Sequence, residues 1–491
     1  MSSRTQVDGK CASIHRPNII IFYTDDQGFG DRQKYHDWLL DMPNFEEVAA
    51  NGMDFSDGHT ASGVCSPSRF ALLTGEYWFR HNPARDVVVS NAHPYVMDAK
   101  TTLPKVLKSV GYKTYMSGKW HLGMKFDEDN FDAGIYGGPI DGGFDSYFGI
   151  PASMDFGNVA FIRDKLFETP PTFWSQRHGN ELWSCRHNVS ACNTWNLRGY
   201  MKQKAPGFAK RISPTWDPRY CAPNITAEAI HFMDIHMKTH GEDVPFFLYT
   251  ALSSPHKPHV PHPDWEGHNK LKFGNYADFL EQTDYHLGQI LANMGKWDIT
   301  DNTLLIISSD NGPEDKQLFQ KSGGLLSAWI YRNGKRSLFE GGHRVPFLMQ
   351  WPKIIPAGAM NDHTVNQVDL VATLAEMTGA TLKKGDAYDS HSFWRAVCDP
   401  AGATPKQVRA GQPMVFEVPK SVSGAGPGIG IRCRNKKVLY AENQWWMFDL
   451  KSDPREKTNI MHEQKKEFDS LKDLLFEIIR KGFSPATAVC H

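Results

Sequence analysis

The segment Ile19-Ile20-Ile21-Phe22-Tyr23-Thr24-Asp25-Asp26-Gln27-Gly28 decides the fold class. Its first five residues are apolar or aromatic, which predicts a strand buried on both faces, and a polar turn follows at once. Three further short runs have the same character, at Lys113–Met116, Phe246–Tyr249 and Thr303–Ile307. Helical periodicity lies between them, at Leu103–Val110, Ala227–Lys238 and Tyr276–Met294. This alternation of strand and helix predicts an α/β layered domain.

Composition excludes several classes of function. The 491 residues are 40% hydrophobic and 22% charged, which is the usage of a globular protein with a large core. The formal net charge of -1 gives no global basic face for nucleic acid, so an anionic substrate must be bound by a local cluster. No run has the roughly eighteen apolar residues of a membrane span. The N-terminus also lacks the apolar stretch of a signal peptide, so we expect either an exported protein whose signal was removed or a cytoplasmic one.

The chain divides by composition into two predicted domains. Residues 1–400 form the predicted catalytic domain, with a Trp-rich, loop-rich insertion at 151–222. Residues 401–491 form a smaller α+β domain, in which strand-like runs precede a charged amphipathic helix; these elements are Met414–Glu417, Ile431–Tyr440, Gln444–Asp449 and Glu463–Arg480. Cys185, Cys192 and Cys221 lie close together in sequence and are either partners in a bridge or unrelated thiols.

Oxygen-bearing side chains follow two of the predicted strands. Asp25 and Asp26 come after Tyr23, and Asp310 and Asn311 come after the strand that ends at Ile307. Ligands of open α/β sheets bind beyond the carboxyl ends of the strands, so these groups converge if the strands are parallel. Converging carboxylates repel one another unless a hard cation joins them, and an irregular all-oxygen set favours calcium over magnesium. Either pair alone reads more simply as a turn, but the two together favour a metal site.

The other two strands are followed by basic residues. Lys119 and His121 stand on a glycine-flanked segment after the second strand, and His256 stands after the third. The segment from Pro255 to Pro263 also contains His259 and His262. Because its prolines forbid a helix, helical metal ligation is excluded, and we expect one functional histidine on a rigid loop.

The most specific signal is Cys65-Ser66-Pro67-Ser68-Arg69-Phe70-Ala71-Leu72-Leu73-Thr74-Gly75. Ser66-Pro67 predicts a helix start, since proline is favoured at the first helical position. Residue 65 then lies at a helix N-terminus, where an anion is stabilised, and Arg69 follows one turn later. A plain reactive cysteine nucleophile is the simpler alternative.

This string resembles the signature of the type I sulfatases, in which the cysteine is oxidised to Cα-formylglycine. Further motifs resemble that family in the same order, namely Asp25-Asp26-Gln27-Gly28, Gly118–Gly123, Pro255-His256, Ser309–Gly312, Gly334-Lys335 and the stretch from Met447 to Asn459. The resemblance implies the alkaline phosphatase fold, a large mixed sheet between helices. It also implies a sulfate ester substrate, with a sulfated glycan expected, and a formylglycine-generating maturation enzyme as partner.

The resemblance further implies a role for each site residue. A calcium ion is held by Asp25, Asp26, Asp310, Asn311 and the modified Cys65, whose hydrate attacks sulfur. Lys119, His256 and Lys335 bind the sulfate. His256, with Lys335, protonates the leaving alcohol, His121 acts as a base afterwards, and Arg69 positions the nucleophile. Two alternatives share the motifs: a formylglycine-dependent phosphodiesterase or phosphonate monoester hydrolase, and an inactive glycan-binding homologue.

Overall fold

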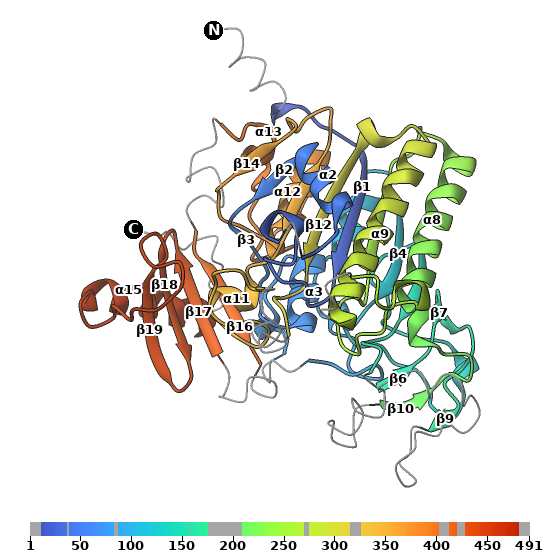
Figure 1. Ribbon diagram of the computed structural model, residues 1–491, viewed down its shortest axis with the longest axis horizontal. Coiled ribbons are helices and arrows are strands. Elements are labelled where there is room, and N and C mark those ends of the chain that lie inside the picture. The colour runs from blue at the N-terminus through green and yellow to red at the C-terminus, as the bar shows by residue number, and fades with distance from the viewer. Residues whose placement is uncertain are drawn as a thin grey trace.

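A large mixed β-sheet organises the protein (Figure 1). The computed structural model describes residues 11–36, 39–82, 87–155, 157–174, 209–269, 274–314, 326–401, 412–419 and 428–480. The sheet has ten strands in the order β14-β2-β13-β12-β1-β11-β4-β5-β7-β8. Their bounds are β1 Asn18–Thr24, β2 Met53–Phe55, β4 Lys113–Lys119, β5 Ser146–Ile150, β7 Ile162–Arg163, β8 Leu166–Phe167, β11 Phe246–Ala251, β12 Thr303–Ser309, β13 Phe347–Gln350 and β14 Ala359–Asn361.

The centre of the sheet is parallel. Strands β12, β1, β11, β4 and β5 pair in parallel, whereas β13 and β7 join antiparallel on the two sides. The four strands predicted from sequence are β1, β4, β11 and β12, and all four are confirmed. Because they run in parallel, their carboxyl ends share one edge of the sheet, as the sequence argument required.

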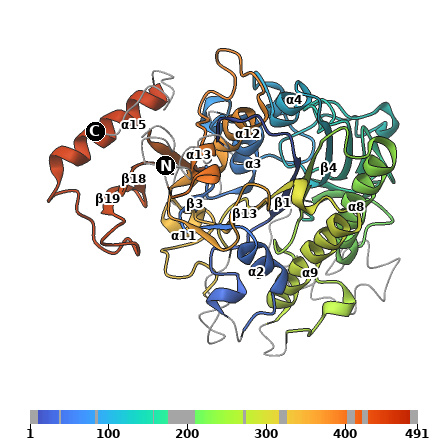
Figure 2. The same cartoon turned by 90° about the horizontal axis from the view of Figure 1, so that it is seen from above.

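Helices cover both faces of the sheet (Figure 2). One face carries α3 Cys65–Thr74, α4 Leu103–Lys108, α12 Leu370–Thr378 and α13 Trp394–Cys398. The other carries α2 Pro43–Ala50, α8 Cys221–His240 and α9 Asn275–Lys296. Strand β1 serves both cores, since Ile19 and Ile21 face the first layer and Ile20 and Phe22 face the second. The predicted α/β fold with a central mixed sheet is therefore confirmed.

Short elements complete the larger part of the chain. They comprise the two-stranded pair β3 Gly58–His59 and β15 Val365–Asn366, the helix α11 Glu340–His343, and 3-10 turns at Gln33–Tyr35, Trp78–Arg80, Tyr95–Met97, Phe131–Ala133, Pro218–Tyr220, Pro263–Trp265, Thr300–Asn302 and Gln367–Asp369. At β4, Gly118 has φ +123°, and a Cβ there would lie 1.9 Å from the Ala251 carbonyl oxygen. Only glycine allows β4 and β11 to approach so closely just before Lys119.

The segment predicted as a loop-rich insertion is partly regular. Strands β7 and β8 within it extend the main sheet, and β6 Gly157–Val159, β10 Ala209–Ile212 and β9 Phe173–Trp174 form a separate small sheet. These strands are only two to four residues long, so they leave little periodicity to detect in the sequence. Trp183 and Trp195 lie outside the described residues.

The C-terminal part is an antiparallel sheet with one helix, as the sequence predicts. The strands are β16 Met414–Val418, β17 Gly428–Cys433, β18 Lys436–Ala441 and β19 Gln444–Asp449, and the helix is α15 Lys465–Arg480. The single run expected at Ile431–Tyr440 is instead two strands, because the chain turns at Arg434, where φ is +53°. A domain boundary at residue 400 stays a prediction.

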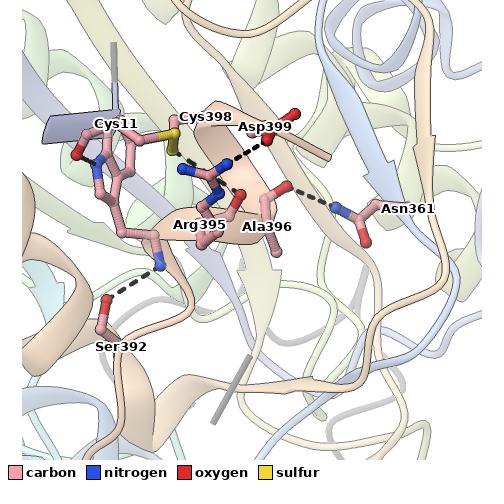
Figure 3. The surroundings of a disulfide bond; sticks show 8 residues. Cys11, Asn361, Ser392, Arg395, Ala396, Cys398 and Asp399 are labelled. Atoms are coloured by element: carbon pink, nitrogen blue, oxygen red, sulfur yellow. Dashed lines mark hydrogen bonds and ion pairs between the residues drawn. A yellow bond between two sulfur atoms is a disulfide. The ribbon is translucent and has the colours of Figure 1, made fainter. Parts of the chain in front are cut away.

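A disulfide between Cys11 and Cys398 ties the N-terminal segment to α13 (Figure 3). Its Cα atoms are 5.5 Å apart, and 387 residues separate the two cysteines in sequence. Beside it, Arg395 pairs with Asp399 at 2.6 Å, and Asn361 donates to the Ala396 carbonyl at 2.9 Å. The bridge considered for Cys221 is not formed, since this residue is a buried free thiol; Cys185 and Cys192 lie outside the described residues. Among the described helices, none is long and apolar enough to cross a membrane.

Candidate active site

The residues singled out in sequence meet at the carboxyl edge of the parallel strands. Asp25 and Asp26 follow β1, Lys119 ends β4, and Asp310 and Asn311 follow β12. All five side chains are almost completely buried. The sheet therefore brings together five charged or polar groups that lie up to 286 positions apart in sequence.

Two cations pair with the carboxylates nearest the sheet. The Arg69 guanidinium donates from Nε and Nη2 to one Asp310 oxygen, at 2.9 and 2.8 Å. Lys119 Nζ donates to Asp25 Oδ2 at 2.7 Å, and Arg69 lies 3.7 Å from the same oxygen. Arg69 also donates to the Lys119 carbonyl at 3.2 Å. The arginine thus connects α3, β4 and the end of β12.

Asp26 is the centre of a second group. It accepts from Lys335 Nζ at 2.5 Å and from Asn311 Nδ2 at 2.7 Å through Oδ1. His256 Nε2 lies 3.8 Å from Oδ2. Burial alone would raise the pKa of Asp26, but the Lys335 ammonium holds it below its ordinary value. The Asp26 backbone has φ +66° and donates to Asp310 at 3.2 Å, which joins the two groups.

Cys65 is the first residue of α3, and its free thiol is buried. The helix begins at Cys65 itself, so Pro67 stands at its third position rather than its first; proline is tolerated there because the first four helical N–H groups have no intrahelical acceptor. Burial raises the pKa of the thiol against the opposing effect of Lys119 and Lys335. Burial therefore disfavours a free thiolate at residue 65.

Both histidines of the site are held neutral. Burial and the nearby Lys119 and Arg69 keep the pKa of His121 well below its ordinary value, and its backbone has φ +60°. Burial, with Lys335, lowers the pKa of His256 to about 4. His256 Nδ1 contacts the Lys257 carbonyl, so this nitrogen carries the proton and Nε2 faces Asp26 with its lone pair.

The donor set fits a hard divalent cation. Several buried oxygens of the residues that follow β1 and β12 have no hydrogen-bond donor, namely Asp25 Oδ1, Asp26 Oδ2, Gln27 Oε1 and Asn311 Oδ1. Burial and the charge of Asp25 raise the pKa of Asp310 to about 6, which shows that these carboxylates repel one another. A calcium or magnesium ion accepts such oxygens and removes that repulsion.

A second buried group, His59, Glu340 and His343, also has the composition of a metal site. Its ligand atoms are already used, since His59 Nε2 contacts Asp57 at 2.8 Å and Glu340 pairs with Lys437 at 2.9 Å. His343 Nε2 lies 3.0 Å from Lys437 Nζ. A cation there would displace an ammonium group, so we assign this group to the packing of the C-terminal sheet.

Two site residues escaped the sequence analysis. Glu314 lies 3.4 Å from Lys335 and pairs with Arg336 at 2.7 Å. The signals were present, because Glu314 comes two residues after Gly312 and Arg336 directly follows Lys335. Their positions in loops beyond the ends of strands did not by themselves distinguish these two residues from charged residues at the protein surface.

The chain belongs to the sulfatase family, a class of sulfuric ester hydrolases. Residues 17–380 match the family model described as Sulfatase, and residues 331–481 match the model described as N-sulphoglucosamine sulphohydrolase, C-terminal. The resemblance noted in sequence is thereby confirmed, and the chain is an enzyme.

Relatives cover almost the whole chain. An N-acetylgalactosamine-6-O-sulfatase of Bacteroides thetaiotaomicron is 29% identical, over 94% of this chain and 92% of its own length. Arylsulfatase A of Homo sapiens is 27% identical, over 91% and 83%. A solved structure from work on the metabolism of multiple glycosaminoglycans by Bacteroides thetaiotaomicron superposes with a TM-score of 0.79 at 26% identity, covering 95% of this chain and 99% of the other. Ps i-CgsB, solved with k-i-k-neocarrahexaose, shares the fold at 24% identity with a TM-score of 0.71, covering 97% and 95%.

The first prediction concerns Arg69. Replacing it in Arg69→Met leaves Asp310 and Asp25 buried without their guanidinium, and breaking a buried ion pair costs about 3–5 kcal/mol. The midpoint of urea unfolding, measured without added divalent cation, should therefore fall markedly. The control is Arg163→Met, which removes the more exposed pair with Glu228 and should cost about 0–1 kcal/mol. Equal midpoints for the two variants would refute the structural importance of the Arg69 pair.

Proposed function

We propose that this sulfatase hydrolyses a sulfate ester of a carbohydrate, with a formylglycine formed from Cys65 and a calcium ion. The observation that carries the proposal is the position of Cys65 at the start of α3, where Lys119 and Lys335 act on it and where buried oxygens of Asp25, Asp26 and Asn311 lack donors. No part of this arrangement is required for folding alone, since an apolar core would avoid the cost of burying so many charges.

Five residues form the proposed cation site. Asp25, Asp26, Asp310, Asn311 and the modified residue 65 would hold the ion, and Gln27 lies beside them with its free Oε1. When bound, the ion and the hydrated formylglycine supply an activated oxygen nucleophile. Arg69 orients that residue from one turn along α3, because its guanidinium is fixed to Asp310 and to the Lys119 carbonyl.

Lys119 and Lys335 bind the sulfate oxygens in this proposal. Both ammonium groups are buried, one beside Asp25 and the other beside Asp26. In a water-poor site each charge stabilises the negative oxygens of the sulfuryl group more strongly than it would in water. Their charges are fixed before the substrate enters, so little reorganisation is needed.

His256 acts as the general acid. Its Nδ1 is held by the Lys257 carbonyl, which leaves Nε2 as the atom that receives and donates the proton. A bound sulfate ester places negative charge near Nε2 and so raises the pKa of this histidine from its low value in the free site. His121 acts as the base afterwards, because its strongly lowered pKa keeps the imidazole neutral.

The relatives support the carbohydrate substrate. One is named for the 6-O-sulfate of N-acetylgalactosamine, and a solved relative comes from work on glycosaminoglycans. Export of the protein is supported by the Cys11–Cys398 disulfide, since such bonds persist mainly in oxidising compartments. The conversion of Cys65 also requires a formylglycine-generating enzyme as a partner.

The second prediction tests the modification. Peptide mass analysis of active protein should show residue 65 as an aldehyde, lighter than the cysteine form. Cys65→Ser should fold normally but release no sulfate from a sulfated glycan. The control is Cys221→Ser, which changes the other buried free thiol and should retain activity. Full activity with an unmodified thiol at residue 65 would contradict the proposal.

The third prediction separates the two histidines. A sugar alcohol leaves as a basic alkoxide, whereas nitrophenol leaves without needing a proton. His256→Ala should therefore lose about a hundredfold to ten-thousandfold in kcat on a glycan sulfate and much less on nitrophenyl sulfate. His121→Ala should lose activity alike on both, since its step follows cleavage of the ester bond. Equal losses for His256→Ala on the two substrates would mean that His256 only binds sulfate.

A further inference from the structure

The adjacent cations Lys335 and Arg336 differ in their access to solvent. The Lys335 side chain is only 4% exposed and pairs with Asp26 inside the site. The Arg336 side chain is 35% exposed. The Lys335 side chain thus faces the reaction centre, whereas the Arg336 side chain reaches the solvent-exposed edge of the site.

Backbone contacts fix Arg336 beside the reacting residue. Its N–H donates to the Gly63 carbonyl at 2.7 Å, and the Lys335 N–H donates to the Pro313 carbonyl at 2.8 Å. Gly63 lies two residues before Cys65, so Arg336 stands next to the start of α3. The main chain at Arg336 has φ +68°, a left-handed conformation that a non-glycine residue adopts only where its surroundings impose it.

Glu314 orients the Arg336 guanidinium. Nη1 lies 2.7 Å from Oε1, and Nη2 lies 3.0 Å from Oε2, which is a two-pronged contact. Burial opposes the charge of Arg336, but the Glu314 carboxylate raises its pKa. Within the described residues, Glu314 is the only side chain that forms an ion pair with Arg336. A guanidinium has five N–H groups, so most of them remain for another acceptor.

We propose that Arg336 binds a second oxyanion of the substrate, a carboxylate or another sulfate, next to the sulfate that is cleaved. Glu314 is the positioning residue that holds the guanidinium fork toward it. The inference rests on the proposed function and narrows its substrate to a glycan with a second negative charge near the scissile ester.

The chemistry of Arg336 supports this assignment. With a formal net charge of -1, the chain has no general attraction for a polyanion, so binding depends on local groups of this kind. Arginine suits a planar carboxylate or a sulfate better than lysine, because its fork donates two parallel hydrogen bonds.

The test uses three disaccharides that carry the same cleavable sulfate. The first has a neighbouring uronate, the second has that uronate reduced to the neutral alcohol, and the third has a second sulfate on a neutral neighbour. Arg336→Gln should lower kcat/KM on at least one of the acidic disaccharides by about tenfold to a hundredfold, mainly through KM, because a hydrogen bond to a charged group is lost. It should change kcat/KM little on the reduced one. Arg336→Lys should recover part of the loss.

The pattern of losses identifies the anion. A loss on the uronate substrate alone assigns a carboxylate, and a loss on the disulfated substrate alone assigns a sulfate; either result supports the inference. The matched control is Arg163→Gln, a more exposed arginine of β7 that pairs with Glu228 and should affect none of the three. Equal loss on charged and neutral substrates, or no loss on any, overturns the inference while sulfate release stands. A wild-type enzyme that releases sulfate from no sulfate ester overturns the proposed function itself.

Discussion

The structure depends on the burial of three carboxylates at one edge of the sheet. Asp25, Asp26 and Asp310 lie within a few ångströms of one another and of Arg69, Lys119 and Lys335. Burying charges is costly unless each is paired, and Asp25 Oδ1 and Asp26 Oδ2 have no donor, so the pairing within the chain is incomplete. A bound cation would complete it. The incompletely paired carboxylates make this edge unfavourable for the stability of the protein. They also suit it to bind a cation, and with it an anionic substrate.

The rest of the fold holds this edge in place. The parallel strands set the spacing of the carboxylates. Helix α3, which packs on one face of the sheet, positions Cys65 and Arg69. Contacts with the C-terminal part of the chain hold the segment that contains Lys335. Glu340, at the start of α11, pairs with Lys437 of the C-terminal sheet at 2.9 Å, and the Glu340 N–H donates to Glu456 at 2.6 Å. The C-terminal sheet therefore contributes to the geometry of the site without supplying any of the proposed catalytic residues. A change in that buried network would move Lys335 and Arg336 together.

Much of this could be predicted from the sequence, and the omissions have physical causes. Buried parallel strands leave long apolar runs, so β1, β4, β11 and β12 were evident, and polar residues at their ends indicated the site. The short strands β6 to β10 have too few residues to show a period. The turn at Arg434 was missed although the polar residues Arg434 and Asn435 separate the two strands, because the run contains neither glycine nor proline to mark a turn. Glu314 and Arg336 were missed because their importance comes from their ion pair and from the contact of Arg336 with Gly63, which join residues distant in sequence that no local pattern reveals. The Cys11–Cys398 bridge spans 387 residues, and spacing alone does not identify such partners.

The central claim is that the carboxylate edge binds a divalent cation that the reaction requires. Its most direct test is titration of the metal-stripped protein with calcium, followed by calorimetry and by the temperature of thermal unfolding. The account predicts one ion bound per chain, a rise in the unfolding temperature and recovery of sulfate release. At a hundredfold excess over Kd, binding stabilises by about 2.7 kcal/mol. Asp26→Asn should weaken the binding and reduce all three effects. Full turnover in the thoroughly chelated protein, or calcium binding that Asp26→Asn leaves unchanged, would contradict the claim.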